Sequence, residues 1–510
     1  MTDKSSALHN GIAPGSDMRT KKLNPLLFLL LLLPFICIPA AWVVLARLMP
    51  LKWYVFGILA LIAAALIVIF RNDRRFNLVL LAFTIGLQLD IHFTTVYSEI
   101  YMSSIGYYIS LALIPLLALY GHWIWRVMMG RESFRFSRSL LLPVAIFGLF
   151  CVLSIAQAQY PQLTQWELVS LVYCLLFFFY MVGNIHNRDD LNLIVLGLVL
   201  SVAVQAVLAL MQFVTGSSLG LGFLGEEQQL MTDVSGASQV SRASGTLGHP
   251  NSLAMYLATL LPLVLGAALV AASWLRRFLL TGVFLLGVAA MVATLSRGGM
   301  LVGAATIFIF IVVWAKRAGK LGIVSSVMLT GVAVAALLLV MLENPIKSRF
   351  IEDRYETAHI RLPLMRVAFN MVEHNLWLGV GLNNYSQTAD KYDNTVERIT
   401  SDFPHPVHNM FLLLLAEIGI FGFLAFLCVV FGALKKGWDT SKARDGELSV
   451  LSLGLTLGLL AMLLHAFVDY FYVSTYFTFW FISGAIVGLW HMKGELLKGT
   501  VLSRTGALLG

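Results

Sequence analysis

The stretch NMFLLLLAEIGIFGFLAFLCVVFGA, from Asn409 to Ala433, decides the fold class of this chain. Its only charged side chain is Glu417. A helix needs about 20 apolar residues to cross a bilayer, whereas a membrane barrel strand would alternate in polarity. The stretch therefore predicts a transmembrane α-helix.

Similar apolar runs recur along the chain. Of its 510 residues 59% are hydrophobic and 12% charged, whereas a soluble domain carries about 25% charged residues. The pattern predicts an all-α fold, a polytopic transmembrane helix bundle in which the first run is a retained helix rather than a signal peptide. We expect about fourteen spans, near 25–46, 53–70, 76–92, 105–126, 139–157, 166–184, 191–213, 250–273, 278–295, 299–315, 321–342, 409–433, 449–467 and 474–490.

Basic residues gather in alternate short loops between these runs. By the positive-inside rule those loops, and both termini, face the cytoplasm. The formal charge of +8 therefore encodes topology and does not predict nucleic-acid binding. The loops concerned carry Arg71, Arg74, Arg75, Arg126, Arg131, Arg135, Arg138, Arg188, Arg276, Arg277, Lys316, Arg317, Lys320, Lys435 and Lys436.

Two long polar segments connect spans on the side opposite to the cytoplasm. They divide the chain into parts. The expected parts are a cytoplasmic tail (1–24), an N-terminal bundle (25–213), a core with an outer loop and a tight turn (214–342), a large extracytoplasmic loop (343–408), C-terminal helices (409–490) and a second cytoplasmic tail (491–510).

The large loop, Glu343 to His408, carries nine of the 27 acidic residues and four of the eleven histidines. A loop this long is more often functional than not. Within it, Pro363 to His374 has the pattern of an amphipathic helix lying on the outer membrane surface. One side of that helix carries Arg366, Asn370, Glu373 and His374, and the other carries Leu364, Ala368, Met371 and Val372.

Three arginines are placed on the outer side. Arg242 opens RASGTLGHPN, Arg297 lies in the connection SRGG, and Arg361 belongs to the large loop. An arginine at a membrane boundary most often extends to the lipid headgroups. Arg297 departs from that interpretation because it breaks the positive-inside pattern and has flanking glycines that allow close approach. Guanidinium groups bind phosphate in a bidentate manner, so the three arginines would hold a pyrophosphate if the fold brings them together.

His408 precedes the span that begins at Asn409. It either caps that helix and contacts headgroups, or takes a proton from an attacking hydroxyl. His405 and His408 have a spacing that metal ligands use, but no third ligand follows at a familiar spacing, so no metal is expected. The cysteines lie in apolar runs without CxxC spacing.

Other polar residues near the outer boundary have simpler interpretations. Glu417 is costly within an apolar helix, which suggests either function or a structural partnership with a nearby arginine or histidine. His249 and Asn251 are candidates to cap the helix that follows them. His465, Asp469 and Asp90 are expected to be ordinary residues at helix ends.

These landmarks resemble the O-antigen ligase and polymerase superfamily, bacterial membrane proteins that handle polyprenyl-pyrophosphate-linked glycans. The resemblance rests on RASGTLGHPN, then SRGG, then RLPLMRVAFNMVEHNLWLGVGLNNYSQ from Arg361, then HNMFLLLLAEIG from His408. It covers roughly residues 240 to 430. Met365 stands where the family usually has an aromatic residue, so the helix of the large loop is expected to pack differently here. The chain is longer than a typical lipid A-core ligase, with extra apolar spans at its N-terminal end, which favours a polysaccharide polymerase.

The resemblance implies a metal-independent glycosyltransferase of the membrane glycosyltransferase C type, without cofactors, active on the periplasmic side of the inner membrane. Arg297 and Arg361, assisted by Arg242, would bind the donor pyrophosphate, and His408 would activate the acceptor hydroxyl. Acceptors would be another glycan, lipid A-core or a protein, and glycan-assembly proteins of the envelope would be partners. The supporting residues would be Glu417, Asn409, Asn251, His249 and His405.

Two other classes compete with this reading. A transporter of a small solute or glycan precursor would show paired repeats and charges near the bilayer midplane. The sequence has no internal repeat, and its polar candidates cluster at one face. A structural scaffold would leave Arg297 and His408 dispensable.

Overall fold

The structure, a computed structural model, describes residues 57–58, 61–62, 74–87, 89–92, 96–98, 103–131, 140–222, 226, 231–234, 238–322, 354–471 and 473–508. All of them belong to one unit, Val55–Gly510. The expected span 25–46, most of 53–70 and 321–342, and the first part of the large loop lie outside the described residues.

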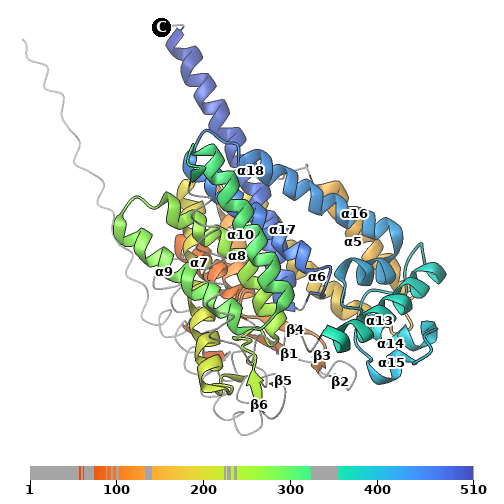
Figure 1. The fold of residues 1–510 in the computed structure, drawn as a ribbon. Helices are drawn as coiled ribbons and strands as arrows, with labels where there is room; N and C mark the ends of the chain where they lie inside the picture. The colour runs from red at the N-terminus through yellow and green to blue at the C-terminus, as the bar shows by residue number, and fades with distance from the viewer. Residues whose placement is uncertain are drawn as a thin grey trace, which may run out of the picture. The chain divides into compact units, whose positions relative to one another are not determined.

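Helices make up most of the described chain (Figure 1). They are α3 (Arg74–Thr84), α4 (Leu113–Met128), α5 (Leu141–Leu153), α6 (Pro161–Asn184), α7 (Arg188–Thr215), α8 (Pro250–Val270), α9 (Trp274–Ala293), α10 (Arg297–Arg317), α13 (Arg354–His374), α14 (Tyr385–Thr388), α15 (Ile399–Asp402), α16 (Met410–Thr440), α17 (Gly446–His465) and α18 (Val473–Leu508), with short 3-10 turns η2 (Ser154–Ala156) and η5 (Ala389–Tyr392).

Seven of the described helices are long and apolar enough to cross a membrane. They are α6, α7, α8, α9, α10, α16 and α17, and α4 and α5 are shorter apolar helices. The chain is therefore a polytopic helical membrane protein, and the described residues carry seven such helices where about fourteen spans were expected for the whole chain.

Two of the expected spans differ from the structure. The helix expected over 76–92 ends at Thr84, and the one expected to begin at 105 begins at Leu113. Between them lie the antiparallel pairs β1 (Asp90–His92) with β4 (Tyr108–Ser110) and β2 (Val96–Ser98) with β3 (Ser103–Ile105). Residues 90–110 are rich in Thr, Val, Ile and Tyr, which favour strands, so the apolar count alone was misleading there. A third pair joins β5 (Met231–Val234) and β6 (Ser238–Ser241), so the fold is not purely α.

The core of the bundle depends on close helix contacts. On α17, Gly454 and Gly458 face α8: a Cβ at residue 458 would lie 1.9 Å from the carbonyl oxygen of Thr259. Helices in membranes associate through small residues that let backbones approach, because lipid provides no hydrophobic drive between them. The result is a rigid α8–α17 pair that carries site residues at one end.

Helix α16 is broken in its first third. Gly419 has a φ of +70°, and a Cβ there would lie 2.3 Å from the carbonyl oxygen of Trp377. The loop after α13 fills the break: Val380 N–H donates to Ala416 O at 3.0 Å, and Ile420 N–H donates to the carbonyl of Leu376 at 2.8 Å. These bonds satisfy backbone groups that would otherwise be unpaired within the membrane.

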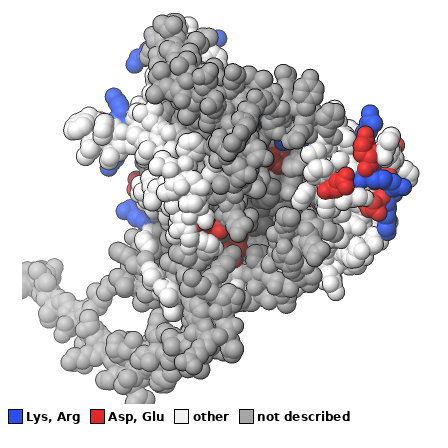
Figure 2. Space-filling view, turned by 60° about the horizontal axis from the view of Figure 1, so that its bottom comes forward, with Lys and Arg blue, Asp and Glu red and all other residues white. Residues whose placement is uncertain are grey.

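Helix α13 has the two-sided pattern expected for residues 363–374. Leu364, Ala368, Met371 and Val372 are buried, whereas Arg366 and Glu373 are exposed. Its neighbours include α16, α15 and η5, so its buried side packs on protein. Figure 2 shows Lys, Arg, Asp and Glu gathered at one edge of the molecule, where α13–α15 lie in Figure 1.

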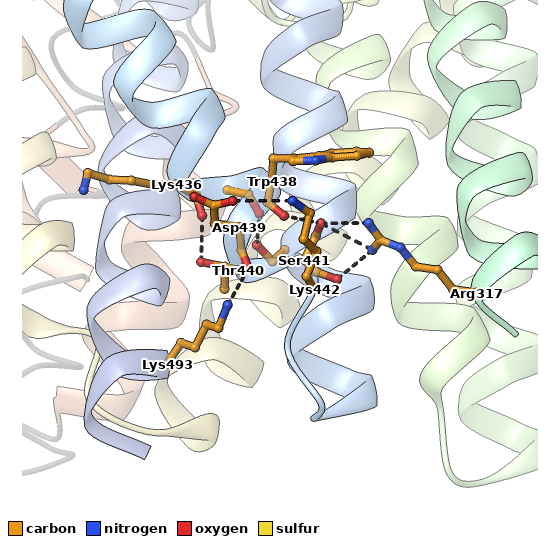
Figure 3. A network of polar contacts seen from close by, with 10 residues as sticks. Arg317, Lys436, Trp438, Asp439, Thr440, Ser441, Lys442 and Lys493 are labelled. Carbon is orange, nitrogen blue, oxygen red and sulfur yellow. Dashed lines mark hydrogen bonds and ion pairs between the residues drawn. The ribbon is translucent and has the colours of Figure 1, made fainter. Parts of the chain in front are cut away.

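The far end of α16 is held by a polar network (Figure 3). Arg317 at the end of α10 donates to the carbonyl of Ser441 at 2.6 Å, and Lys493 of α18 donates to the carbonyl of Asp439 at 2.5 Å. Lys442 lies 3.6 Å from the Asp439 carboxylate. This network joins α10, α16 and α18 at the end of the bundle opposite to His408.

Candidate active site

His408 pairs with an aspartate from a distant turn. Its Nδ1 lies 3.2 Å from Oδ1 of Asp469. The backbone holds the two segments together, because Met410 N–H donates to the carbonyls of Ala466 at 2.9 Å and Asp469 at 3.1 Å. The His408 side chain is 27% exposed and that of Asp469 is 1% exposed. The pair therefore presents an accessible imidazole backed by a buried carboxylate.

Asp469 is held ionised by its surroundings. Burial acts to raise its pKa, but the hydrogen bond with His408 and the attraction of His408, His249 and His465 in their protonated forms outweigh burial and lower the pKa to about 2. Tyr470 N–H also donates to Oδ1 at 2.9 Å. Among the described residues none donates to Oδ2, which leaves this oxygen able to accept a bond from a ligand or water.

His249 is the N-cap of α8. Its Nδ1 accepts a hydrogen bond from Asn251 N–H at 3.1 Å, which requires that nitrogen to be unprotonated. Burial, together with the charges of Arg242, His408 and His465, lowers the pKa of His249 to about 4 although Asp469 opposes the shift. The capping role expected for His249 is thus present, and the residue lies within the same cluster.

Arg361 and Arg297 lie near each other and near Asp469. Burial and the like charge of Arg297 lower the pKa of the Arg361 guanidinium, and the charge of Asp469 raises it. Arg297 is the first residue of α10, whose N-cap is Ser296. A cation at the positive end of a helix dipole is unfavourable unless an anion is near. The arrangement is therefore suited to bind an anion.

Arg242 supports the turn that leads into α10. Its Nε donates to the carbonyl of Thr294 at 3.1 Å, and its guanidinium donates to Oδ1 of Asn251 at 3.1 Å. The next residue of that turn, Leu295, has a φ of 51°, which is unusual for a branched side chain. Arg242 thus lies beside the cluster and positions the segment that carries Arg297.

The glycines of SRGG allow α10 to approach its neighbours. A Cβ at Gly298 would lie 3.3 Å from the imidazole of His465 and 3.0 Å from Val468. A Cβ at Gly299 would lie 2.4 Å from that of Ala254 on α8. The connection that sequence reasoning singled out therefore packs directly against the turn that carries Asp469.

Asp469 and His465 are the residues that sequence reasoning missed, since both were expected to be ordinary residues at helix ends. Both side chains are 1% exposed. The sequence did contain a signal for them, since the two residues are spaced four apart at the end of an apolar helix. Burying two ionisable groups there is costly, so their presence indicates a function.

The remaining candidates lie at different places. Asn409 caps α16, since its side chain accepts from Leu412 N–H at 3.0 Å. The pKa of His405 is lowered by burial and by the charge of His408. Glu417 accepts from Tyr385 N–H at 3.3 Å and faces a separate cavity. Its partner is thus the backbone of the large loop rather than the arginine or histidine expected.

In the described part of the chain no group of three or more His, Cys, Asp or Glu could hold a metal ion.

The fold and site define a polytopic helical membrane protein with an arginine, histidine and aspartate cluster at one end of the bundle. Residues 282–427 match the family model Wzy_C, described as O-antigen ligase. This match confirms the resemblance to the O-antigen ligase and polymerase superfamily, and it includes Arg297, Arg361 and His408. No curated protein matches the chain.

Proposed function

We propose that the protein transfers a polyprenyl-pyrophosphate-linked glycan to a hydroxyl acceptor on the periplasmic side of the bacterial inner membrane. The O-antigen ligase match implies a membrane enzyme of the ligase or polymerase type. The observation that carries the finer proposal is the His408–Asp469 pair beside Arg297 and Arg361. A general base, its orienting carboxylate and two fixed cations are the groups that this reaction needs.

The proton moves first to His408. With Nδ1–H donating to Asp469, Nε2 is left with its lone pair free to accept the proton of the acceptor hydroxyl. The acceptor oxygen then bonds to the anomeric carbon of the donor glycan. The ionised Asp469 stabilises the imidazolium that forms.

The leaving group is the lipid pyrophosphate. The bond between the anomeric carbon and the pyrophosphate oxygen breaks, and its electron pair leaves with the polyprenyl pyrophosphate. Arg297 and Arg361 stabilise the negative charge that develops there, and Arg242 holds the turn in place. The positive charge in this proposal comes from side chains, without a metal or cofactor.

The test uses the full-length protein in liposomes with a polyprenyl-pyrophosphate glycan and candidate acceptors. Activity in the wild type that is lost in His408→Ala supports the proposal, with His374→Ala, on the exposed end of α13, as a matched control. Chain extension identifies a polymerase, and a single transfer identifies a ligase. Full activity in His408→Ala contradicts the assignment.

A transporter is less well supported. Broken helices are common in transporters, and α16 is broken at Gly419. In this protein, however, the backbone of residues 376–381 fills the break. Solute flux through liposomes without glycan transfer would favour the transporter.

A further inference from the structure

A cavity lies beside the segment that carries His408. It has a volume of about 240 Å³ and is formed by α5, α6, α16 and α18, which lie side by side in the bundle (Figure 1). Pro406 and Met410, on either side of His408 in the chain, line it. So does Tyr470, whose ring centroid is 5.6 Å from that of His408. The cavity is therefore next to His408 in the fold and is lined by its chain neighbours.

Two carboxyl groups face this cavity. Glu417 lines it from α16 and Glu167 from α6, and they lie close enough for the charge of Glu167 to act on Glu417. The hydroxyl of Ser386, also on the wall, is buried and has no hydrogen-bond partner among the described residues. A buried polar group without a partner is costly and indicates a ligand.

Nine of the 23 described residues that line the cavity are aromatic. Trp166, Trp480, Tyr108 and Tyr476 are among them. Flat apolar rings together with a few hydrogen-bonding groups suit a sugar ring, which has apolar C–H faces and polar edges. No lysine, arginine or histidine is among the described residues that line the cavity, so it does not suit the donor pyrophosphate.

The size of the cavity limits its occupant. Pockets for drug-sized ligands have volumes of about 300–1,000 Å³, so this one suits a single small ring. We propose that the cavity binds the neutral sugar that carries the acceptor hydroxyl, through Glu167, Glu417 and the aromatic wall, and directs that hydroxyl toward His408. The acceptor role rests on the proposed glycan transfer, whereas the binding of a neutral sugar does not.

Binding is tested by saturation-transfer NMR on the full-length protein in nanodiscs. The probes are methyl glycosides of glucose, galactose, mannose and N-acetylglucosamine, with choline as a cationic comparison. At least one glycoside is expected to bind, and Glu167→Gln to weaken that binding about tenfold, because an amide replaces the carboxyl group that bonds to the sugar hydroxyls. Glu373→Gln, which changes an exposed carboxyl on α13, is the matched control.

A second variant covers the case in which Glu167→Gln does not fold. Leu414→Trp, on the cavity wall, would fill the space and abolish glycoside binding. The proposal is overturned if no glycoside binds, if choline binds in their place, or if both variants bind glycosides as the wild type does.

Two further measurements separate this proposal from the proposed function. Binding of inorganic pyrophosphate tests the arginine cluster, and we expect Arg297→Ala to lose it while retaining glycoside binding. If glycosides bind through Glu167 but no transfer occurs, the proposed function fails and the sugar site stands.

In an active enzyme, Glu167→Gln should raise the KM for the acceptor about tenfold and leave the KM for the donor unchanged. An unchanged acceptor KM contradicts the acceptor role.

Discussion

Oδ1 of Asp469 lies 3.2 Å from Nδ1 of His408, although 61 residues separate the two in the chain. The contact forms where α17 ends and α16 begins, and backbone hydrogen bonds from Met410 fix the distance between the two segments. A carboxylate in this position selects the tautomer of the imidazole and stabilises its protonated form.

Replacing Asp469 by Asn should therefore reduce kcat for glycan transfer. The amide can no longer stabilise an imidazolium, and general base catalysis contributes about 10²–10⁴-fold to a rate, so we expect a loss of about 100-fold or more. The measurement is kcat in liposomes, with Asp402→Asn, which changes an exposed carboxyl at the end of α15, as control. A change of less than about threefold would show that His408 does not depend on Asp469.

Asp469 should also make stability depend on pH. Its pKa falls from the ordinary value of 3.8 to about 2 in the folded protein. Because the folded value is the lower one, the stabilisation is complete above the unfolded value and is lost as the pH falls toward the folded value, and it amounts to about 2 kcal/mol. Thermal unfolding in detergent between about pH 6 and pH 2 should show a steeper loss in wild type than in Asp469→Asn. Parallel curves would contradict this.

Burial of His249 gives a loss of stability in the same direction, but at higher pH. Its pKa is lowered to about 4, so the unfolded chain binds a proton at this residue before the folded protein does. We expect the folded state to lose stability as the pH falls from about 6.5 to about 4. His249→Asn retains a capping side chain and should remove this loss, and NMR titration of labelled histidines checks the pKa directly. A His249 that titrates near 6.5 would contradict the neutral cap.

Arg297→Lys should weaken the binding of inorganic pyrophosphate. A lysine keeps the charge but cannot bind phosphate in a bidentate manner, and we expect about tenfold or more weaker binding by calorimetry. Arg276→Lys, near the start of α9 and exposed, is the matched control. Equal loss in both variants would indicate a general charge effect rather than a site.

Gly419→Ala should destabilise the protein. The position has a φ of +70°, and a Cβ would lie 2.3 Å from the carbonyl of Trp377. Strain and clash together should cost about 2–4 kcal/mol and displace the loop 376–381. Gly282→Ala in α9, where a Cβ would meet nothing within 4 Å, should be neutral or stabilising. Equal melting temperatures for the two variants would show that the break in α16 tolerates a side chain.

Much of the fold follows from local patterns. The α16 and α8 helices begin at Met410 and Pro250, within a residue of the expected 409 and 250, because an N-cap side chain adjoins a long apolar run at each. The expectation was wrong over 76–92, where residues with strand propensity end the helix although the stretch is apolar. The kink at Gly419 was not expected, since the loop that stabilises it lies forty residues earlier in sequence.

The sequence by itself determined the class of protein, and it singled out Arg297, Arg361 and His408 as candidate site residues. Hydropathy is a property of contiguous residues, and an arginine such as Arg297 is conspicuous in an apolar run without any knowledge of its neighbours. Only the tertiary structure decided that Arg297 and Arg361 lie near each other, and that Asp469 rather than Glu417 is the partner of His408. The physical reason is that electrostatic and hydrogen-bond partners are chosen by distance in space, which the packing of α8, α10, α16 and α17 sets.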